Sequence, residues 1–130
     1  MRNHNITLEQ KITNAVNQEA DFTQKLELTN RDGRYVVATR NIWTGKLPSH
    51  KANMITIITD AVKEALFAGC DSIGGWKDKN TGIYYVDACV HFQYKSQAME
   101  VAIANEEIAI YDLFEQEEIR VEDYIKETLL

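Results

Sequence analysis

Residues 72–93 read SIGGWKDKNTGIYYVDACVHFQ, and this stretch decides the fold. Aromatic and β-branched residues, which favour strands, fill Ser72–Lys77 and Ile83–Gln93. Between them, residues 78–82 are turn formers ending in glycine. The pattern predicts a β-hairpin, so the fold contains an antiparallel sheet.

The returning strand predicts two unlike sheet faces, because successive side chains of a strand point to opposite sides. One face is wholly apolar and carries Tyr84, Val86, Ala88, Val90 and Phe92. The other is mixed and carries Ile83, Tyr85, Asp87, Cys89 and His91. Such a sheet packs helices on one side and meets a ligand, a partner or solvent on the other.

The elements after the hairpin alternate between helix and strand. Ser96 is expected to cap a helix that runs through Ala104, with its apolar residues on one stripe. Further strands are predicted over 108–113 and 117–121, followed by a terminal helix over 121–130.

The elements before the hairpin are less regular. Thr7 and Gln10 fit a capping box for a helix over about residues 8–20. Residues 22–28 either extend that helix or form a strand. The patterns that follow predict strands over 35–40 and 54–59, a polar loop over 41–53, and a helix over 60–68 capped by Thr59 and closed by Gly69.

These elements predict one α+β domain over 1–130, an antiparallel-rich sheet packed with three to four helices. The sequence holds no apolar run of about 18 residues, and its first residues do not resemble a signal segment. Cys70 and Cys89 fit no disulfide or zinc pattern, so buried thiols and a cytoplasmic location are expected.

Charge is unevenly distributed along the chain. The net charge of −6 argues against general binding to nucleic acid or anionic membranes. Residues 31–51 hold five bases and His50 against Asp32, whereas residues 100–130 hold ten acids against Arg120 and Lys126. This polarity could attract an anion, join two subunits of a homo-oligomer, or leave two solvated faces.

No catalytic, metal or cofactor motif stands out. Nucleophile and phosphate-loop signatures are missing, and Gly74 and Gly75 fit a close backbone approach in a strand. Asp87 is the exception, because a carboxylate in an apolar strand must be bonded, paired or neutral. It either accepts hydrogen bonds from a neighbouring loop or orients a ligand or a basic residue across a subunit boundary.

The sequence does contain a set of residues whose side chains could together bind a ligand. Arginine forks, aromatic faces and amides together suit a nucleotide-like ligand, although Trp packing and solvated bases explain the same residues. The candidates are Arg31, Arg34, Arg40, Lys46, Ser49, His50 and Lys51 as donors, Trp43 and Trp76 as flat faces, and Asn41 and Asn105 as ring-edge readers.

Several segments resemble a small family of bacteriophage and prophage proteins. They are 74–87 (GGWKDKNTGIYYVD), 109–113 (AIYDL) with Ala98, Ala102 and Asn105 before it, and 43–48 (WTGKLP). The characterised family most similar to these motifs is the first family of phage Thoeris anti-defence proteins. Its members sequester cyclic ADP-ribose signals made by bacterial TIR proteins.

The resemblance implies an oligomeric ligand trap without enzymatic activity, in which aromatic and Asn side chains hold adenine and Arg side chains hold pyrophosphate. It assigns these roles to Phe92, Asn105 and Arg120. A simple ion pair of Arg120 with Glu117 or Glu118 is the competing interpretation.

Three hypotheses follow. The first is a homo-oligomer that sequesters a nucleotide-derived immune signal in the host cytoplasm. The second is an inhibitor whose acidic C-terminal region binds a host protein. The third is an enzyme acting on a nucleotide or sugar through Asp87 or His91.

Overall fold

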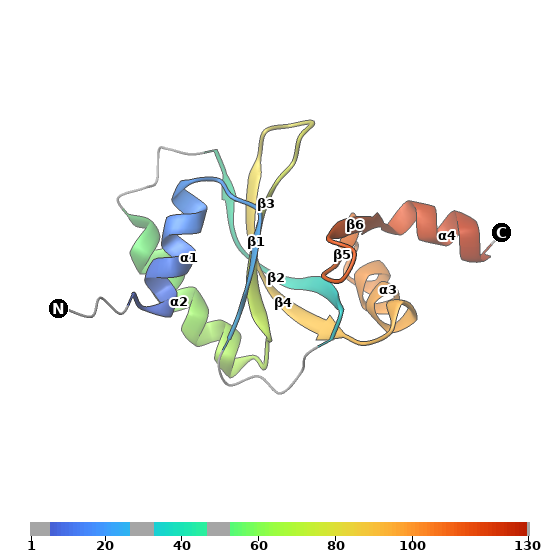
Figure 1. Ribbon diagram of the computed structural model, residues 1–130, viewed down its shortest axis with the longest axis horizontal. Helices are drawn as coiled ribbons and strands as arrows, with labels where there is room; N and C mark the ends of the chain where they lie inside the picture. The colour runs from blue at the N-terminus through green and yellow to red at the C-terminus, as the bar shows by residue number, and fades with distance from the viewer. Residues whose placement is uncertain (1–5, 27–32, 47–52, 130) are drawn as a thin grey trace.

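The computed structural model describes residues 6–26, 33–46 and 53–129 (Figure 1). The helices among them are α1 (Leu8–Asn17), α2 (Met54–Phe67), α3 (Lys95–Ala104) and α4 (Val121–Leu129). The strands are β1 (Phe22–Lys25), β2 (Tyr35–Gly45), β3 (Ser72–Lys77), β4 (Tyr84–Phe92), β5 (Ala109–Asp112) and β6 (Glu117–Arg120). The six form one antiparallel sheet in the order β1-β3-β4-β2-β5-β6, which confirms the predicted α+β class.

The predicted hairpin is confirmed as β3 and β4. Their register pairs Ser72 with Cys89 and Lys77 with Tyr84. In the turn, Gly82 has a φ of 73° and its N–H donates to the Asp78 carbonyl over 2.8 Å. Glycine adopts this left-handed conformation without the steric cost that a Cβ imposes.

Two pairs of helices, α1 with α2 and α3 with α4, pack on one face of β4. This confirms the prediction that this face is apolar and buried by helices. Tyr84, Val86 and Ala88 join a core with buried residues of α1 and α2. Phe92, on the same face by alternation, packs against a second core formed with α3 and α4. The sheet curls, so the two helix pairs lie at its opposite ends (Figure 1).

The mixed face of β4 is only partly open. Tyr85 is half-buried, whereas Asp87, Cys89 and His91 are 8%, 5% and 2% exposed. At the His91 end this face is therefore interior. Among the described side chains of this face, the one near the hairpin turn, Tyr85, is the more accessible to a ligand or a partner.

The strand predicted over 54–59 is wrong. α2 starts at Met54, and its buried residues recur at helical spacing: Met54, Ile58, Ala61, Val62 and Ala65. Thr59 lies inside the helix, where its hydroxyl donates to the Ile55 carbonyl over 2.7 Å instead of capping. Gly69, with a φ of 77°, follows the helix end as predicted.

The polar loop predicted over 41–53 is wrong in its first part. Residues 41–45 continue β2, although two register shifts against β4 interrupt the pairing. Phe22 begins strand β1, which settles the alternative left open for residues 22–26. Leu28 lies outside the described residues.

The elements predicted at the two ends of the chain are present, with small differences in their first and last residues. Thr7 caps α1 by accepting from the Gln10 N–H over 3.1 Å, but the helix ends at Asn17 rather than Ala20. Both cysteines are free and buried, as predicted. None of the described helices has the length and apolar character needed to cross a membrane.

Candidate functional site

Three sequence-predicted site residues come together on the mixed sheet face, where one is exposed, one is half-buried and one is 8% exposed. They are Asn41 on β2, Trp76 on β3 and Asp87 on β4, from three adjacent strands. α1 and α2 cover the opposite face of the same strands. We call this group, with its neighbours Thr44, Tyr85 and Glu107, the sheet-face site.

Trp76 and Tyr85 form an aromatic surface within the site. The two residues are cross-strand partners, and their rings stack with centroids 5.0 Å apart and planes 16° from parallel. Both side chains are half-buried. A flat aromatic surface of this kind stacks well with a planar ligand ring.

Asn41 and Asp87 form a hydrogen-bonded pair beside the aromatic surface. The Asn41 Nδ2 group donates to Asp87 Oδ1 over 3.0 Å and to Thr44 Oγ1 over 2.9 Å. The two shifts of β2 register fall on either side of Asn41, between Ala38 and Arg40 and between Asn41 and Trp43. β-bulges re-aim side chains in this way, so Asn41 is turned to the Asp87 side of the sheet.

Burial sets the electrostatics of the site. Loss of water raises the pKa of Asp87, and the hydrogen bond from Asn41 only partly offsets this effect. Burial also raises the pKa of Glu107, and repulsion by Asp87 adds to the shift. Both carboxyls therefore hold their proton to higher pH than an exposed carboxyl does, and a protonated carboxyl can donate a hydrogen bond as well as accept one.

Sequence reasoning missed three members of the site. Tyr85 and Thr44 could have been found, because they share the predicted alternation or follow Trp43 directly in the chain. Glu107 could not, since it follows α3, far from Asp87 in the chain, and comes near it only in the folded structure.

The remaining predicted ligand residues lie elsewhere. Trp43 packs against the first core and Phe92 against the second, so both contribute to packing. Arg40 and Lys46 are exposed on or beside β2, and exposed Asn105 follows the C-terminus of α3. The remaining candidates lie outside the described residues: Arg31, Ser49, His50 and Lys51.

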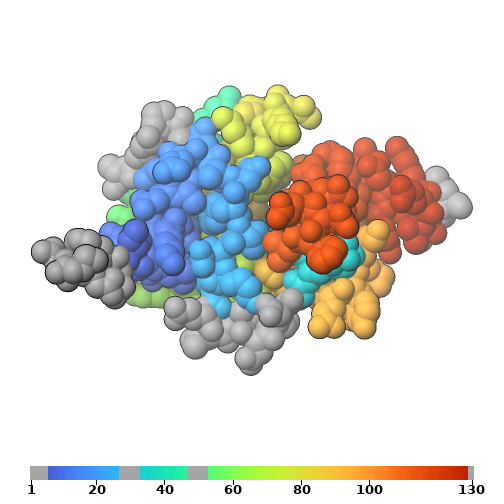
Figure 2. All heavy atoms as spheres, viewed as in Figure 1, coloured from blue at the N-terminus to red at the C-terminus, as the bar shows by residue number. Residues whose placement is uncertain are grey.

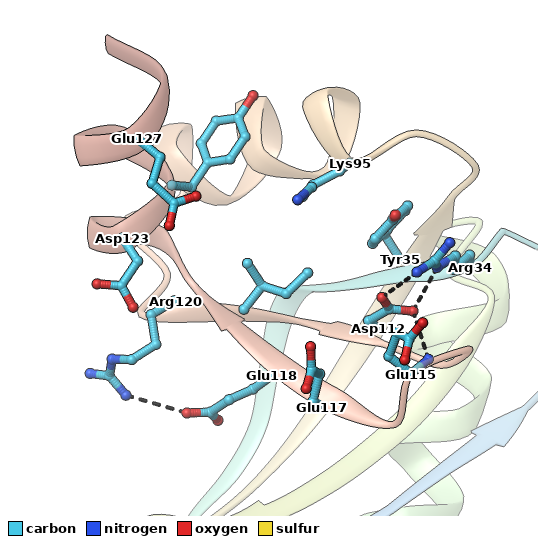
Figure 3. Close-up of a pocket in the computed structure, with 12 residues that line it drawn as sticks. Arg34, Tyr35, Lys95, Asp112, Glu115, Glu117, Glu118, Arg120, Asp123 and Glu127 are labelled. Atoms are coloured by element: carbon cyan, nitrogen blue, oxygen red, sulfur yellow. Dashed lines mark hydrogen bonds and ion pairs between the residues drawn. The ribbon is translucent and has the colours of Figure 1, made fainter. Parts of the chain in front are cut away.

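Arg34 and Arg120 lie beside a concavity at the C-terminal end, which we call the C-terminal groove (Figure 3). It has a volume of about 700 Å³ and is bordered by β5, β6, α3 and α4 (Figure 2 shows these C-terminal elements in orange and red). Arg120 pairs with Glu118 at 3.3 Å, which confirms the predicted ion pair. This leaves Arg120 in a mainly acidic surrounding.

The Arg34 guanidinium is bound by residues of the protein itself. We call its contacts with Asp112, Tyr35 and Phe114 the clasp. Its Nε and Nη2 donate to the two carboxylate oxygens of Asp112 over 2.7 and 2.8 Å. Its guanidinium also lies about 5 Å from the rings of both Tyr35 and Phe114. Asp112 in turn accepts from the N–H groups of Phe114 and Glu115, so the clasp fastens the β5–β6 turn to β2.

The clasp predicts an acid-dependent loss of stability. The Arg34 hydrogen bonds lower the pKa of Asp112 from 3.8 to about 2. A carboxyl whose pKa is lower in the folded state contributes stability above pH 4, and this stability is lost as pH falls through 4 to about 2. Asp112→Asn should therefore unfold at lower urea concentration near neutral pH, and the difference from the unmodified protein should shrink towards pH 2.

Urea unfolding of both proteins at several pH values checks this prediction. Glu100→Gln is the matched control, since it removes an exposed carboxylate on α3 that the clasp does not use. A difference between Asp112→Asn and the parent that stays constant from pH 7 to pH 2 would contradict the role given to the clasp.

A buried Ser–His pair also lies on the mixed face. His91 Nδ1 lies 3.2 Å from the Gly33 carbonyl oxygen, to which it must donate, and Nε2 lies 2.8 Å from Ser72 Oγ. In the neutral ring, Nε2 then accepts the Ser72 hydroxyl proton. Nucleophilic enzymes use a similar contact between a serine and a histidine. Here Ser72 is 0% exposed and His91 2% exposed, so the pair forms a hydrogen bond inside the protein that a substrate does not reach.

The comparisons with known proteins add no relative. No family model, curated protein or solved structure matches the chain. Within residues 6–26, 33–46 and 53–129, no three His, Cys, Asp or Glu side chains form a group that could hold a metal ion.

Proposed function

We propose that the protein binds a small nucleotide-derived signal at the sheet-face site and sequesters it without cleaving it. The observation that carries the proposal is the stacked Trp76–Tyr85 pair beside the hydrogen-bonded Asn41 and Asp87. A planar ring needs an apolar surface and polar groups at its edge, and this site supplies both. The resemblance to phage proteins that trap cyclic ADP-ribose signals supports the same class of ligand.

The polar pair presents a specific pattern to a ring edge. Both hydrogens of the Asn41 amide are engaged by Asp87 and Thr44, so its carbonyl oxygen remains as an acceptor. A protonated Asp87 offers a donor through its second oxygen. An acceptor next to a donor complements the amine and ring nitrogen of adenine, whereas an ionised Asp87 would offer acceptors only.

Ligand binding should therefore depend on pH. The carboxyl form of Asp87 is lost as pH rises through its raised pKa, so affinity for an adenine-containing ligand should fall in that direction. Asp87→Asn places a neutral donor at the same position. This variant should keep its affinity at the higher pH where the parent loses it, and Asp87→Leu should bind weakly at every pH.

Titration calorimetry with cyclic ADP-ribose isomers, from pH 5.5 to 9, tests the proposal. Lys79→Gln, an exposed change in the β3–β4 turn, controls for loss of charge. Absence of binding by the parent at every pH would reject the function. If the parent and Asp87→Asn bind with the same pH profile, the proposed ligand stands, but Asp87 does not recognise it.

A further inference from the structure

The C-terminal groove carries more negative charge than its own residues neutralise. Six acids and three bases border it. Two of the bases are used within the groove, in the Arg34–Asp112 and Arg120–Glu118 pairs. Among the described residues no ion pair engages the remaining acids, Glu115, Glu117, Asp123 and Glu127. Figure 3 shows their carboxylates distributed around the groove.

Two unpaired backbone edges accompany this charge. β6 is the last strand of the sheet, so one side of it has no partner strand within residues 6–26, 33–46 and 53–129. β2 pairs with β5 only at Tyr35 and Val36, so its distal half, residues 40–45, also has no described strand on that side. Unpaired edges are templates for pairing with another chain.

The edges differ in charge. Exposed Glu117 and Glu118 lie on β6, whereas exposed Arg40 begins the distal half of β2 and Lys46 follows it. An apolar anchor lies beside the acidic edge, because Phe114 in the β5–β6 turn is 76% exposed. Aromatic residues are enriched at protein–protein interfaces relative to the rest of the surface.

We infer that a second copy of the chain docks here, with the distal half of its β2 along β6 and its Arg40 in the C-terminal groove. The contact joins two different surfaces, so it is heterologous and builds a ring or a longer assembly. Because Asn41 and Thr44 also belong to the distal half of β2, the docked copy would border the sheet-face site. The contact does not depend on the proposed ligand.

Native mass spectrometry of the ligand-free protein, over a series of salt concentrations, tests the inference. The parent should assemble at low salt and dissociate as salt rises. Arg40→Glu and Glu117→Lys, made separately, should each raise the dissociation constant about tenfold or more. Lys63→Glu, an exposed charge reversal on α2, should leave assembly unchanged.

A mixture of the two single variants gives the sharpest result. The intact groove of the Arg40→Glu chain binds the intact β2 of the Glu117→Lys chain, and the two reversed charges face each other at the next contact, so the mixture should assemble as the parent does. The two changes combined in one chain should also restore the assembly. Thermal unfolding of each variant shows whether it is folded.

The inference is overturned if the parent is monomeric at every salt and protein concentration, or if Arg40→Glu assembles as the parent does. It is also overturned if Glu117→Lys affects only the binding of a Lys- and Arg-rich peptide, since the groove would then take a different protein.

Discussion

Tyr84→Ala should lower the free energy of unfolding by about 3–5 kcal/mol, as expected when a fully buried aromatic ring is removed. Tyr84 is 0% exposed and lies in the core that α1 and α2 form with the sheet. Its hydroxyl also donates to the Ala20 carbonyl over 2.6 Å, which fastens the connection between α1 and β1 to β4. Gly75 on β3, which pairs with Val86, leaves room for the end of this ring, because a Cβ there would collide with the Tyr84 hydroxyl.

Urea unfolding measures this loss. Tyr84→Phe keeps the ring and should cost only about 1–3 kcal/mol, through the unsatisfied Ala20 carbonyl. Phe67→Ala is the matched control, since Phe67 is 96% exposed and its ring contributes little to the core. A Tyr84→Ala protein as stable as Phe67→Ala would mean that β4 is not packed as described.

Trp76→Ala should weaken binding of the proposed ligand about 5- to 150-fold. Stacking of a base on an aromatic side chain contributes about 1–3 kcal/mol, and Trp76 supplies the larger ring of the Trp76–Tyr85 stack. The fold should tolerate the change, since Trp76 is only half-buried and lies outside both cores.

Calorimetry at fixed pH measures the loss, with unfolding curves to show that the variant is folded. Tyr94→Ala, which removes an aromatic ring that is 64% exposed near α3, is the matched control. Equal affinities for Trp76→Ala and Tyr94→Ala would exclude the stacked pair from ligand binding, even if the parent binds.

The hairpin could be predicted because its signals are local. Turn residues at 78–82 and the alternation along β4 are visible in neighbouring positions. The strand prediction for residues 54–59 was wrong because the signal that decides their structure is not local. Ile and Thr favour strands, but contacts with α1 and the sheet bury one stripe of a helix there. Tertiary packing overrode the local preference.

The site was predictable in residue type but not in geometry. Trp76, Asn41 and Asp87 were each identified, yet only the bulged register of β2 brings Asn41 to Asp87. Arg34 was expected to hold an anion, but Asp112, 78 positions away in the chain, occupies its guanidinium. Long-range pairings of this kind have no signature in a single sequence.

The central claim is that the protein holds a nucleotide-derived signal intact. Its most direct test is to incubate the protein with a cyclic ADP-ribose isomer, remove free ligand, heat the complex and identify the released molecule by mass spectrometry. The proposal predicts that the protein retains the ligand and that heating releases it with its mass and cyclic structure unchanged. Failure to retain any ligand, or release of a hydrolysed product, would contradict it.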